Sequence, residues 1–191
     1  DAFGAAHRSN SSTTGIAEFL PSFAGLLLSK EVKELSQALD APSRPLAAII
    51  GGAKVSTKFK VLDHLLGTVD YLLIGGGMAF TFFKAQGLEI GQSLVELDLV
   101  DDARAFLEKA KESSTKLLLP VDQVVAEAFD NNAPSQVKAV DSFGKNDMGL
   151  DAGPDTVAAF KQVLEHSETI IWNGPLGVFE MSNFAQGTKS I

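Results

Sequence analysis

Residues 49–58 of the chain read IIGGAKVSTK, a stretch that joins a predicted strand to a predicted helix. The apolar run Leu46–Ile50 is typical of a buried strand, the glycine pair ends it, and residues 55–66 carry apolar side chains at helical spacing. A helix N-terminus has unpaired N–H groups and glycine lets a ligand approach the backbone, so this turn is a candidate anion site. The charges of Lys54 and Lys58 oppose the helix dipole unless an anion binds between them; two solvated surface lysines are the alternative.

The composition limits the possible partners. The 191 residues include 16 Lys and Arg against 24 Asp and Glu, a net charge of -8, which argues against a nucleic-acid or anionic-membrane surface. Any anion must therefore bind at a local site. The chain has no cysteine, so disulfide and thiol chemistry are excluded and an intracellular compartment is the default expectation. Its apolar runs fall far short of a membrane span.

Strand-like and helix-like patterns alternate from Leu46 onward. Further strands are predicted at residues 71–74, 117–121, 137–140 and 169–172, and helices at residues 78–85, 98–111 and 153–164. Strands that are apolar on both faces and alternate with helices predict a parallel sheet. The expected fold class is therefore α/β, a doubly wound, Rossmann-like parallel sheet with helices on both faces, preceded by a long helix.

The N-terminal part of the chain differs from this pattern. A polar segment up to Thr14 carries His7 and Arg8 side by side, which could hold an anion or belong to a solvated loop. Residues 16–39 then carry apolar side chains on one helical stripe, with Pro21 expected in the first turns. This predicted helix could connect two lobes. The chain has no initiator Met, and we expect it to be part of a longer protein.

Three predicted strands end in glycine turns, at residues 51–52, 75–77 and 173–177. Ligands of parallel sheets bind outside the carboxyl ends of the strands, so all three turns should line one rim and together predict a nucleotide or phosphate cleft. Ordinary turn chemistry is the alternative for any one of them. The common motifs do not explain them, because Phe80 replaces the small residue of a dinucleotide fingerprint and no G-x-x-x-x-G-K-[ST] loop is present.

Other polar residues carry weaker signals. Glu180 follows the third turn and is either a ligand of two ribose hydroxyls or a solvated acid. Residues 148–154 form a predicted glycine turn before a helix, suited to packing against a flat ring or serving only as a loop. His64 and His166 have no partner at metal-ligand spacing and are expected to be surface or core histidines.

Five motifs, in this order along the chain, resemble phosphoglycerate kinase. They are DAFGAAHR at residues 1–8, GGAKVSTK at 51–58, GGGMAFTF at 75–82, GLDAGP at 149–154 and WNGPLGVFE at 172–180. The resemblance extends over essentially the whole chain. It implies a two-lobed enzyme whose N-terminal lobe binds 3-phosphoglycerate and whose C-terminal lobe binds Mg-ADP or Mg-ATP. The implied reaction is reversible phosphoryl transfer between 1,3-bisphosphoglycerate and ADP.

The resemblance also implies roles for individual residues. Arg8 and Lys54 would be the catalytic cations, and Arg8 with His7 would hold the phosphoglycerate. The other implied residues surround the nucleotide: Lys54 and Lys58 at the phosphates, Gly75, Gly76, Gly149 and Leu150 at the adenine, Asn173 and Pro175 beside phosphates and ribose, and Glu180 on the ribose hydroxyls. Such a site agrees with phosphoryl transfer, which needs positioned positive charge rather than a covalent partner.

The same resemblance divides the chain. Residues 1–14 would be the tail of the phosphoglycerate lobe, residues 15–40 the interdomain helix and residues 41–191 an incomplete nucleotide lobe. Asn10 stands where many relatives carry a second substrate histidine, which is a departure from the family pattern. The family's Gly-Gly-Gly-Asp segment is absent, so no metal ligand is expected in this chain and the aspartate that reaches Mg²⁺ is expected beyond Ile191.

We expect a monomeric protein, cytoplasmic or plastid, with no nucleic-acid or membrane partner, and we expect the 191 residues alone to be inactive. A non-catalytic nucleotide-binding module is the alternative, against which Arg8 and Lys54 argue because a simple binder needs neither. A nicotinamide dehydrogenase on the same fold class is disfavoured by Phe80.

Overall fold

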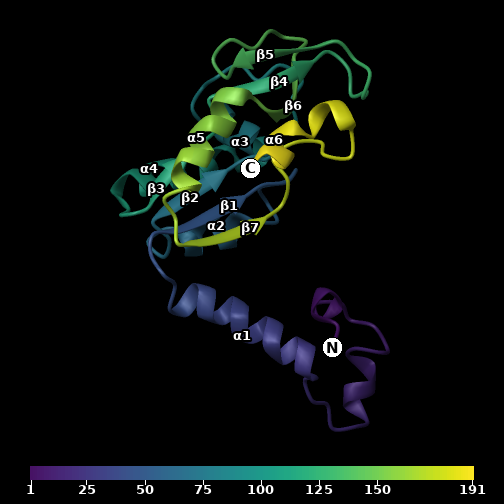
Figure 1. Ribbon diagram of the computed structural model, residues 1–191. Helices are drawn as coiled ribbons and strands as arrows, with labels where there is room; N and C mark the ends of the chain where they lie inside the picture. The colour runs from purple at the N-terminus through teal and green to yellow at the C-terminus, as the bar shows by residue number, and fades with distance from the viewer. The chain divides into compact units, whose positions relative to one another are not determined.

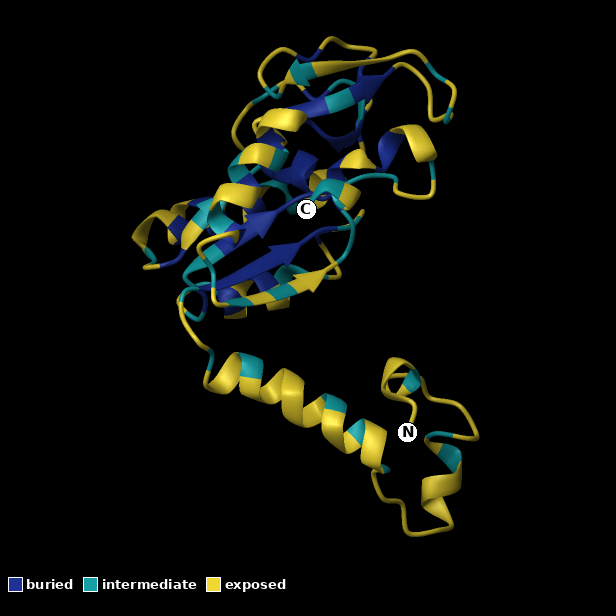
Figure 2. Ribbon diagram, viewed as in Figure 1, coloured by how far each residue is buried: buried dark blue, intermediate teal, exposed yellow.

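The computed structural model describes residues 1–191, which form two compact units, Asp1–Ser43 and Arg44–Ile191 (Figure 1). The first unit contains two short 3-10 helices, η1 (Phe3–Ala5) and η2 (Gly15–Glu18), and the helix α1 (Leu26–Asp40). None of its residues is buried, as Figure 2 shows. The assignment of this unit to the tail of a substrate lobe and an interdomain helix stays a prediction.

The predicted helix over residues 16–39 is wrong at its N-terminal end. Instead, η2 ends at Glu18, residues 21–25 are irregular, and α1 begins only at Leu26. Pro21 has no N–H to donate and disfavours helix in the residue before it, and Gly25 adopts an extended N-cap conformation with ψ of 175°. The apolar residues that predicted a single helix are therefore divided between η2, the irregular segment and α1.

The second unit is built on a parallel sheet, as predicted. Its strands are β1 (Leu46–Ile50), β2 (Tyr71–Ile74), β3 (Lys116–Leu118) and β7 (Thr169–Asn173), in the order β3-β2-β1-β7. The strand β1 is central and completely buried, which its uninterrupted apolar sequence requires. Edge strand β7 is more open, with Ile170 48% exposed.

Helices cover both faces of this sheet, which confirms the predicted fold class. Leu46, Ala48 and Ile50 share one core with residues of α2 (Phe59–Leu65), α3 (Ala79–Ala85) and α4 (Val100–Glu112). Ala47 and Ile49 point to the opposite face, because strand side chains alternate, and share a second core with residues of α5 (Pro154–Leu164). Both layers are visible in Figure 1.

A second sheet was not predicted. It is antiparallel, with order β5-β4-β6, and contains β4 (Asp122–Ala126), β5 (Ser135–Ala139) and β6 (Met148–Ala152). Residues 148–152, expected to be a turn, are thus a strand. Glycine and aspartate have low strand propensity, and only pairing with β4 makes this segment extended. The predicted short strand at residues 137–140 corresponds to β5.

The helix after the glycine pair is shorter than predicted. It begins at Phe59 rather than Val55, because residues 56–58 form a turn in which the Thr57 hydroxyl donates to the Lys54 carbonyl at 3.0 Å. Such local bonds compete with helix formation. Lys54 therefore lies outside the helix, so its predicted opposition to the helix dipole is wrong, whereas Lys58 is the N-cap residue and its charge does oppose the dipole.

The remaining elements are short. They are η3 (Leu97–Leu99), η4 (Ser182–Phe184) and α6 (Gln186–Ser190). No helix is both long and apolar enough to cross a membrane.

Candidate functional site

The three glycine turns meet at the carboxyl edge of the parallel sheet, as predicted. The Gly51 N–H donates to the Asn173 carbonyl and the Gly52 N–H to the Pro175 carbonyl, both at 2.9 Å. The Gly52 carbonyl in turn accepts the Met78 N–H at 2.9 Å. These bonds tie the turns after β1, β2 and β7 into one continuous rim.

Most of the rim glycines serve this close packing of backbone on backbone. A Cβ at Gly51 would lie 2.2 Å from the Pro175 carbonyl oxygen, and a Cβ at Gly174 would lie 2.3 Å from the Gly51 carbonyl oxygen. Gly76 combines a φ of +69° with a similar approach to Gly52. Gly52 differs, because a Cβ there would meet no atom within 4 Å. It is therefore the rim glycine that leaves open space for a ligand.

A cavity of about 580 Å³ opens against this rim. Five residues of the predicted nucleotide site line it: Gly76, Gly149, Leu150, Pro175 and Glu180. Its other lining residues are Gly52, Ala53, Gly77, Phe80, Gln92, Leu94, Gln123, Phe129, Met148, Leu176, Gly177 and Val178. The size and the mostly apolar wall are those of a small-molecule site.

One wall of the cavity is formed by Gly149 in β6 and by Phe80. A Cβ at Gly149 would lie 2.1 Å from Phe80 Cζ, so only glycine lets the strand contact the ring. The Gly149 N–H donates to the Ser93 hydroxyl at 3.0 Å, and Phe80 packs edge-to-face on Phe83 with ring centroids 5.6 Å apart. The Phe80 ring fills the space that a Gly149 side chain would take, so the ring and the backbone of β6 together form this part of the wall.

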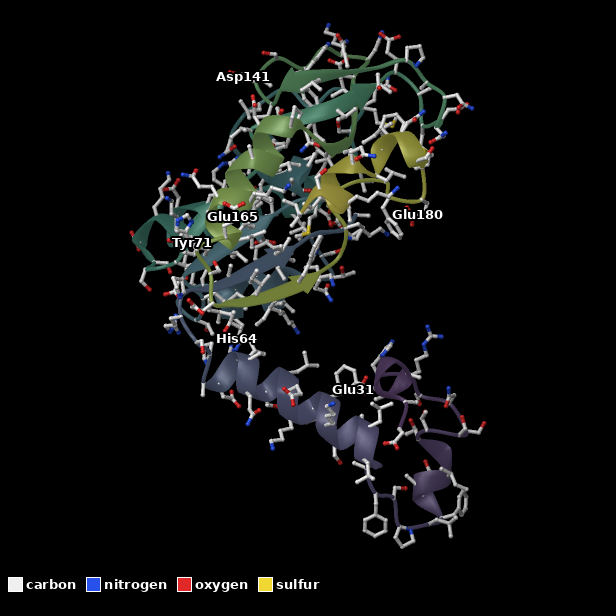
Figure 3. All side chains as sticks on the ribbon, in the orientation of Figure 1. Glu31, His64, Tyr71, Asp141, Glu165 and Glu180 are labelled. Carbon is white, nitrogen blue, oxygen red and sulfur yellow. The ribbon has the colours of Figure 1, made fainter.

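The loop after β7 forms another part of the wall. The Val178 N–H donates to the Leu150 carbonyl at 2.8 Å, which joins this loop to β6. Glu180, labelled in Figure 3, lies in this loop and is exposed. Gly75 does not line the cavity; a Cβ there would lie 2.4 Å from Leu176 Cδ2, so its small size lets Leu176 pack behind the rim.

The two lysines lie outside the cavity lining but next to the rim. Lys58 Nζ donates to the Asn173 side-chain oxygen, which joins two predicted site residues that are 115 positions apart. Lys54 is exposed. Both lysines therefore follow the same glycine turn, but only Lys58 has a side-chain partner.

The turn that follows Lys54 is held by Glu96. Its carboxylate accepts the Ser56 N–H at 2.9 Å and the Ser56 hydroxyl at 2.5 Å. Partial burial acts to raise the pKa of Glu96, but the hydrogen bonds from Ser56 and Val55 and the charge of Lys54 outweigh it, so the pKa lies below its usual value. Glu96 is thus an ionised anchor for the lysine-bearing turn.

A second carboxylate, Asp151, lies beneath the cavity wall in β6 and is 1% exposed. Its oxygens accept the Ala152 N–H at 3.0 Å and the Gly187 N–H at 2.7 Å. Burial raises the pKa of Asp151 to about 6, although the N–H groups of Gly187, Ala152 and Gln186 oppose this shift. Asp151 therefore joins the cavity strand to α6 rather than facing a ligand.

The predicted substrate residues belong to the first unit. His7 and Arg8 are exposed, and neither side chain has a hydrogen bond or ion pair. The Asn10 side-chain oxygen accepts the Thr13 N–H at 3.0 Å and the Thr13 hydroxyl at 2.6 Å. The Asn10 side chain therefore organises the loop that follows the basic pair.

Several cavity residues were not predicted, chiefly Phe80, Leu94, Gln123, Phe129 and Met148. Two of them lie on strands of the second sheet and Phe129 follows β4, so the missed sheet explains these omissions. From the sequence, Phe80 excluded a dinucleotide fingerprint and belonged to the GGGMAFTF motif, but it was not assigned to the site. His64 (Figure 3) and His166 are both exposed.

A parallel α/β sheet with helices on both faces and a cavity at its carboxyl-end turns defines a protein of the doubly wound class. The family model for phosphoglycerate kinase matches residues 1–191. The chain therefore belongs to the phosphoglycerate kinase family.

Individual relatives agree with this assignment. A phosphoglycerate kinase of Prochlorococcus marinus is 56% identical over all of this chain, which covers 48% of that relative, and one of Synechococcus sp. is 53% identical over all of this chain and 47% of the relative. The structure of phosphoglycerate kinase from Coxiella burnetii matches with a TM-score of 0.89 and 46% identity, over 98% of this chain and 49% of that one. The chain thus spans about half the length of these relatives.

Proposed function

We propose that the full-length protein is a phosphoglycerate kinase, which transfers a phosphoryl group reversibly between 1,3-bisphosphoglycerate and ADP. The observation that carries the proposal is the cavity at the joined glycine turns, with Lys58 bonded to Asn173 beside it, in a chain of this family. An adenine nucleotide fits this arrangement, because the apolar cavity suits the base and the lysines outside it suit the phosphates.

The proposed roles follow from where the residues lie. The base occupies the cavity between Gly76 and the Gly149–Leu150 wall, and the ribose lies toward Pro175 and Glu180, whose carboxylate can accept both hydroxyls. Lys58 binds the nucleotide phosphates, and its bond to Asn173 brings the amide beside them. Gly75 contributes indirectly, because its lack of a side chain allows Leu176 to pack against the rim.

Lys54 is assigned to the phosphoryl group in transfer. It is exposed and without a side-chain partner, and Glu96 fixes the turn that follows it, so its charge is positioned yet free to meet an anion. Phosphoryl transfer depends on positive charge held where negative charge develops. His7 and Arg8 are proposed to bind 3-phosphoglycerate, on the basis of the resemblance alone.

Mg²⁺ enters the proposal only as the ion that accompanies nucleotide phosphates. No group of three or more His, Asp or Glu side chains in the chain is arranged to hold a metal. Mg²⁺ on a nucleotide is usually held by the phosphates with one or two carboxylates, and no residue of the chain is assigned to it. The expectations of a monomer and a cytoplasmic location likewise rest on the family resemblance.

A coupled assay on the full-length protein tests the proposal. We expect ATP-dependent phosphorylation of 3-phosphoglycerate, followed by reduction of the product by an added dehydrogenase and detected as NADH consumption. Calorimetric titration with ADP accompanies it. Binding of ADP without turnover would instead support a non-catalytic nucleotide-binding module, and absence of both would refute the proposal.

A further inference from the structure

The loop between β4 and β5, residues 127–134, is joined to the segment after β7 by three hydrogen bonds. The Asn131 side-chain oxygen accepts the Ser182 hydroxyl at 3.2 Å and the Asn183 N–H at 3.1 Å. The Asn131 backbone carbonyl accepts the Asn183 side-chain Nδ2–H at 2.6 Å. Asn131 therefore binds a segment 51 and 52 positions away through both its side chain and its backbone.

Both of the joined segments contribute side chains to the cavity. Phe129 lies two residues before Asn131 and Glu180 lies two residues before Ser182, and both line the cavity. Phe129 is 61% exposed, whereas Phe80, the other aromatic residue of the lining, is 1% exposed. Phe129 is therefore the aromatic residue of the lining that has exposed apolar surface to lose when a ligand binds.

The segment after β7 is anchored independently of the loop. The Val178 N–H donates to the Leu150 carbonyl at 2.8 Å. Phe184 is completely buried and shares a small core with Ala126 and Leu150. This segment therefore has a backbone anchor before Glu180 and an apolar anchor after it.

The loop between β4 and β5 has fewer anchors. Apart from the bonds of Asn131 to Ser182 and Asn183, its hydrogen bonds lie within residues 128–133. Ala133 is its one residue that packs against the small core. Asn131 therefore supplies the only hydrogen bonds that hold this loop to the segment of Glu180.

We propose that Asn131 is a positioning residue for nucleotide binding, whose bonds to Ser182 and Asn183 hold Phe129 at the edge of the cavity before the nucleotide arrives. This inference rests on the proposed nucleotide function. A loop that is already ordered loses less conformational entropy when it contacts a ligand, so these bonds tighten binding. They take no part in phosphoryl transfer, because neither lysine of the rim lies in the cavity lining.

Calorimetric titration of the full-length protein with ADP and with adenosine tests this role. We expect Asn131→Ala to weaken both ligands by the same factor, about three- to tenfold, because both place the same base in the cavity. In steady-state kinetics the KM for ADP should rise by a similar factor, and kcat should not fall. Asn183→Ala, which removes one of the three bonds from the other segment, should weaken ADP binding in the same direction.

Asn132→Ala is the matched control. Asn132 is an exposed amide of the same loop, and its side chain bonds only to Asn131, at 3.4 Å, and not to the segment of Glu180. This variant should bind ADP with the affinity of the wild type. A loss equal to that of Asn131→Ala would overturn the inference.

A double-mutant cycle separates positioning from a general effect on the fold. If Asn131 acts through Phe129, Asn131→Ala should cost little ADP affinity in a protein that already carries Phe129→Ala. Additive losses would overturn the inference, and so would unchanged ADP affinity in either single variant. A lower unfolding temperature of Asn131→Ala with unchanged ADP affinity would show that the bonds are only structural. If the wild-type protein bound neither ADP nor adenosine, the proposed function would fall as well, so the two failures are distinguishable.

Discussion

Lys54 and Lys58 are four residues apart in sequence but differ in their surroundings. Lys58 is partly buried and bonded to Asn173, whereas Lys54 is exposed and unpaired on a turn that Glu96 holds. A bonded lysine is suited to hold a ligand in the ground state. An unpaired one can interact most strongly with charge that appears only during the reaction. The two residues should therefore affect different kinetic constants.

Substitution of Lys54 tests this difference. We expect Lys54→Ala in the full-length protein to lower kcat by about a hundredfold, since loss of one electrostatic partner of the transition state costs on the order of 3 kcal/mol. Nucleotide affinity should change much less. Lys60→Ala, at an exposed lysine on α2, is the control and should leave both constants unchanged. Steady-state kinetics with ADP titrations measures both; equal losses in binding and turnover would show that Lys54 only anchors nucleotide.

Asp151 gives a prediction for pH dependence. Folding raises its pKa from 3.8 to about 6, so the native state binds this proton more tightly than the unfolded state. The free energy of unfolding should therefore increase as pH falls from about 6 to about 4. At neutral pH, where Asp151 is ionised in both states, the buried charge lowers the free energy of unfolding by about 3 kcal/mol. Urea unfolding at pH 7 and pH 5 should show this residue adding about 1 kcal/mol at the lower pH. Asp151→Asn should lack that increment, and parallel pH profiles of the two proteins would contradict the assignment.

At the scale of single elements, α5 depends on a residue from another strand. Its N-cap is Gly153, which has no side chain to accept the first N–H groups. The Asp122 carboxylate of β4 accepts them instead, from Asp155 at 3.0 Å and Thr156 at 2.7 Å. A Cβ at Gly153 would lie 2.3 Å from this carboxylate, so the glycine makes room for the cap. The helix start and the second sheet are thus joined.

Removal of this cap should be costly. We expect Asp122→Ala to lower the free energy of unfolding by about 2 kcal/mol, because the part-buried Asp155 N–H and the buried Thr156 N–H lose their acceptor and the Thr156 hydroxyl loses one of its two. Asp155→Asn removes an exposed charge from the same helix turn and should cost less than about 1 kcal/mol. Urea unfolding monitored by circular dichroism compares the two. Equal effects would mean that Asp122 contributes only its charge.

At the scale of the whole chain, burial is divided unequally. All three hydrophobic core clusters lie within residues 44–191, and the first unit has no buried residue. In that unit Phe23 and Leu26 are each 90% exposed and Phe19 is 80% exposed. A unit without a core of its own contributes little cooperative stability.

This division predicts that residues 44–191 fold alone. The shortened polypeptide should show a single cooperative urea transition with a midpoint close to that of the 191-residue chain. It should also bind less of a fluorescent hydrophobic dye, since the exposed apolar residues of the first unit are gone. A polypeptide of the same composition in scrambled order controls for dye binding to unfolded chain. Loss of the transition would show that the first unit is required for the fold.

The sequence by itself determined the elements whose signals are local. Buried strands such as Leu46–Ile50 are continuous apolar runs, and α5 begins at a Gly-Pro step, so both could be identified without their neighbours. The shared rim also followed, because carboxyl ends of parallel strands lie at one edge of a sheet. Five of the predicted nucleotide residues consequently line the cavity.

The tertiary structure alone decided what depends on contacts between distant residues. Residues 148–152 are extended only because β4 pairs with them, and Gly149 contacts the Phe80 ring only because the two segments meet. Gln123 is buried because other parts of the fold pack over its face of β4. Local propensity opposes each of these outcomes, since glycine, aspartate and glutamine are poor residues for a buried strand. Long-range pairing and packing outweigh that preference, and no window of sequence contains both partners.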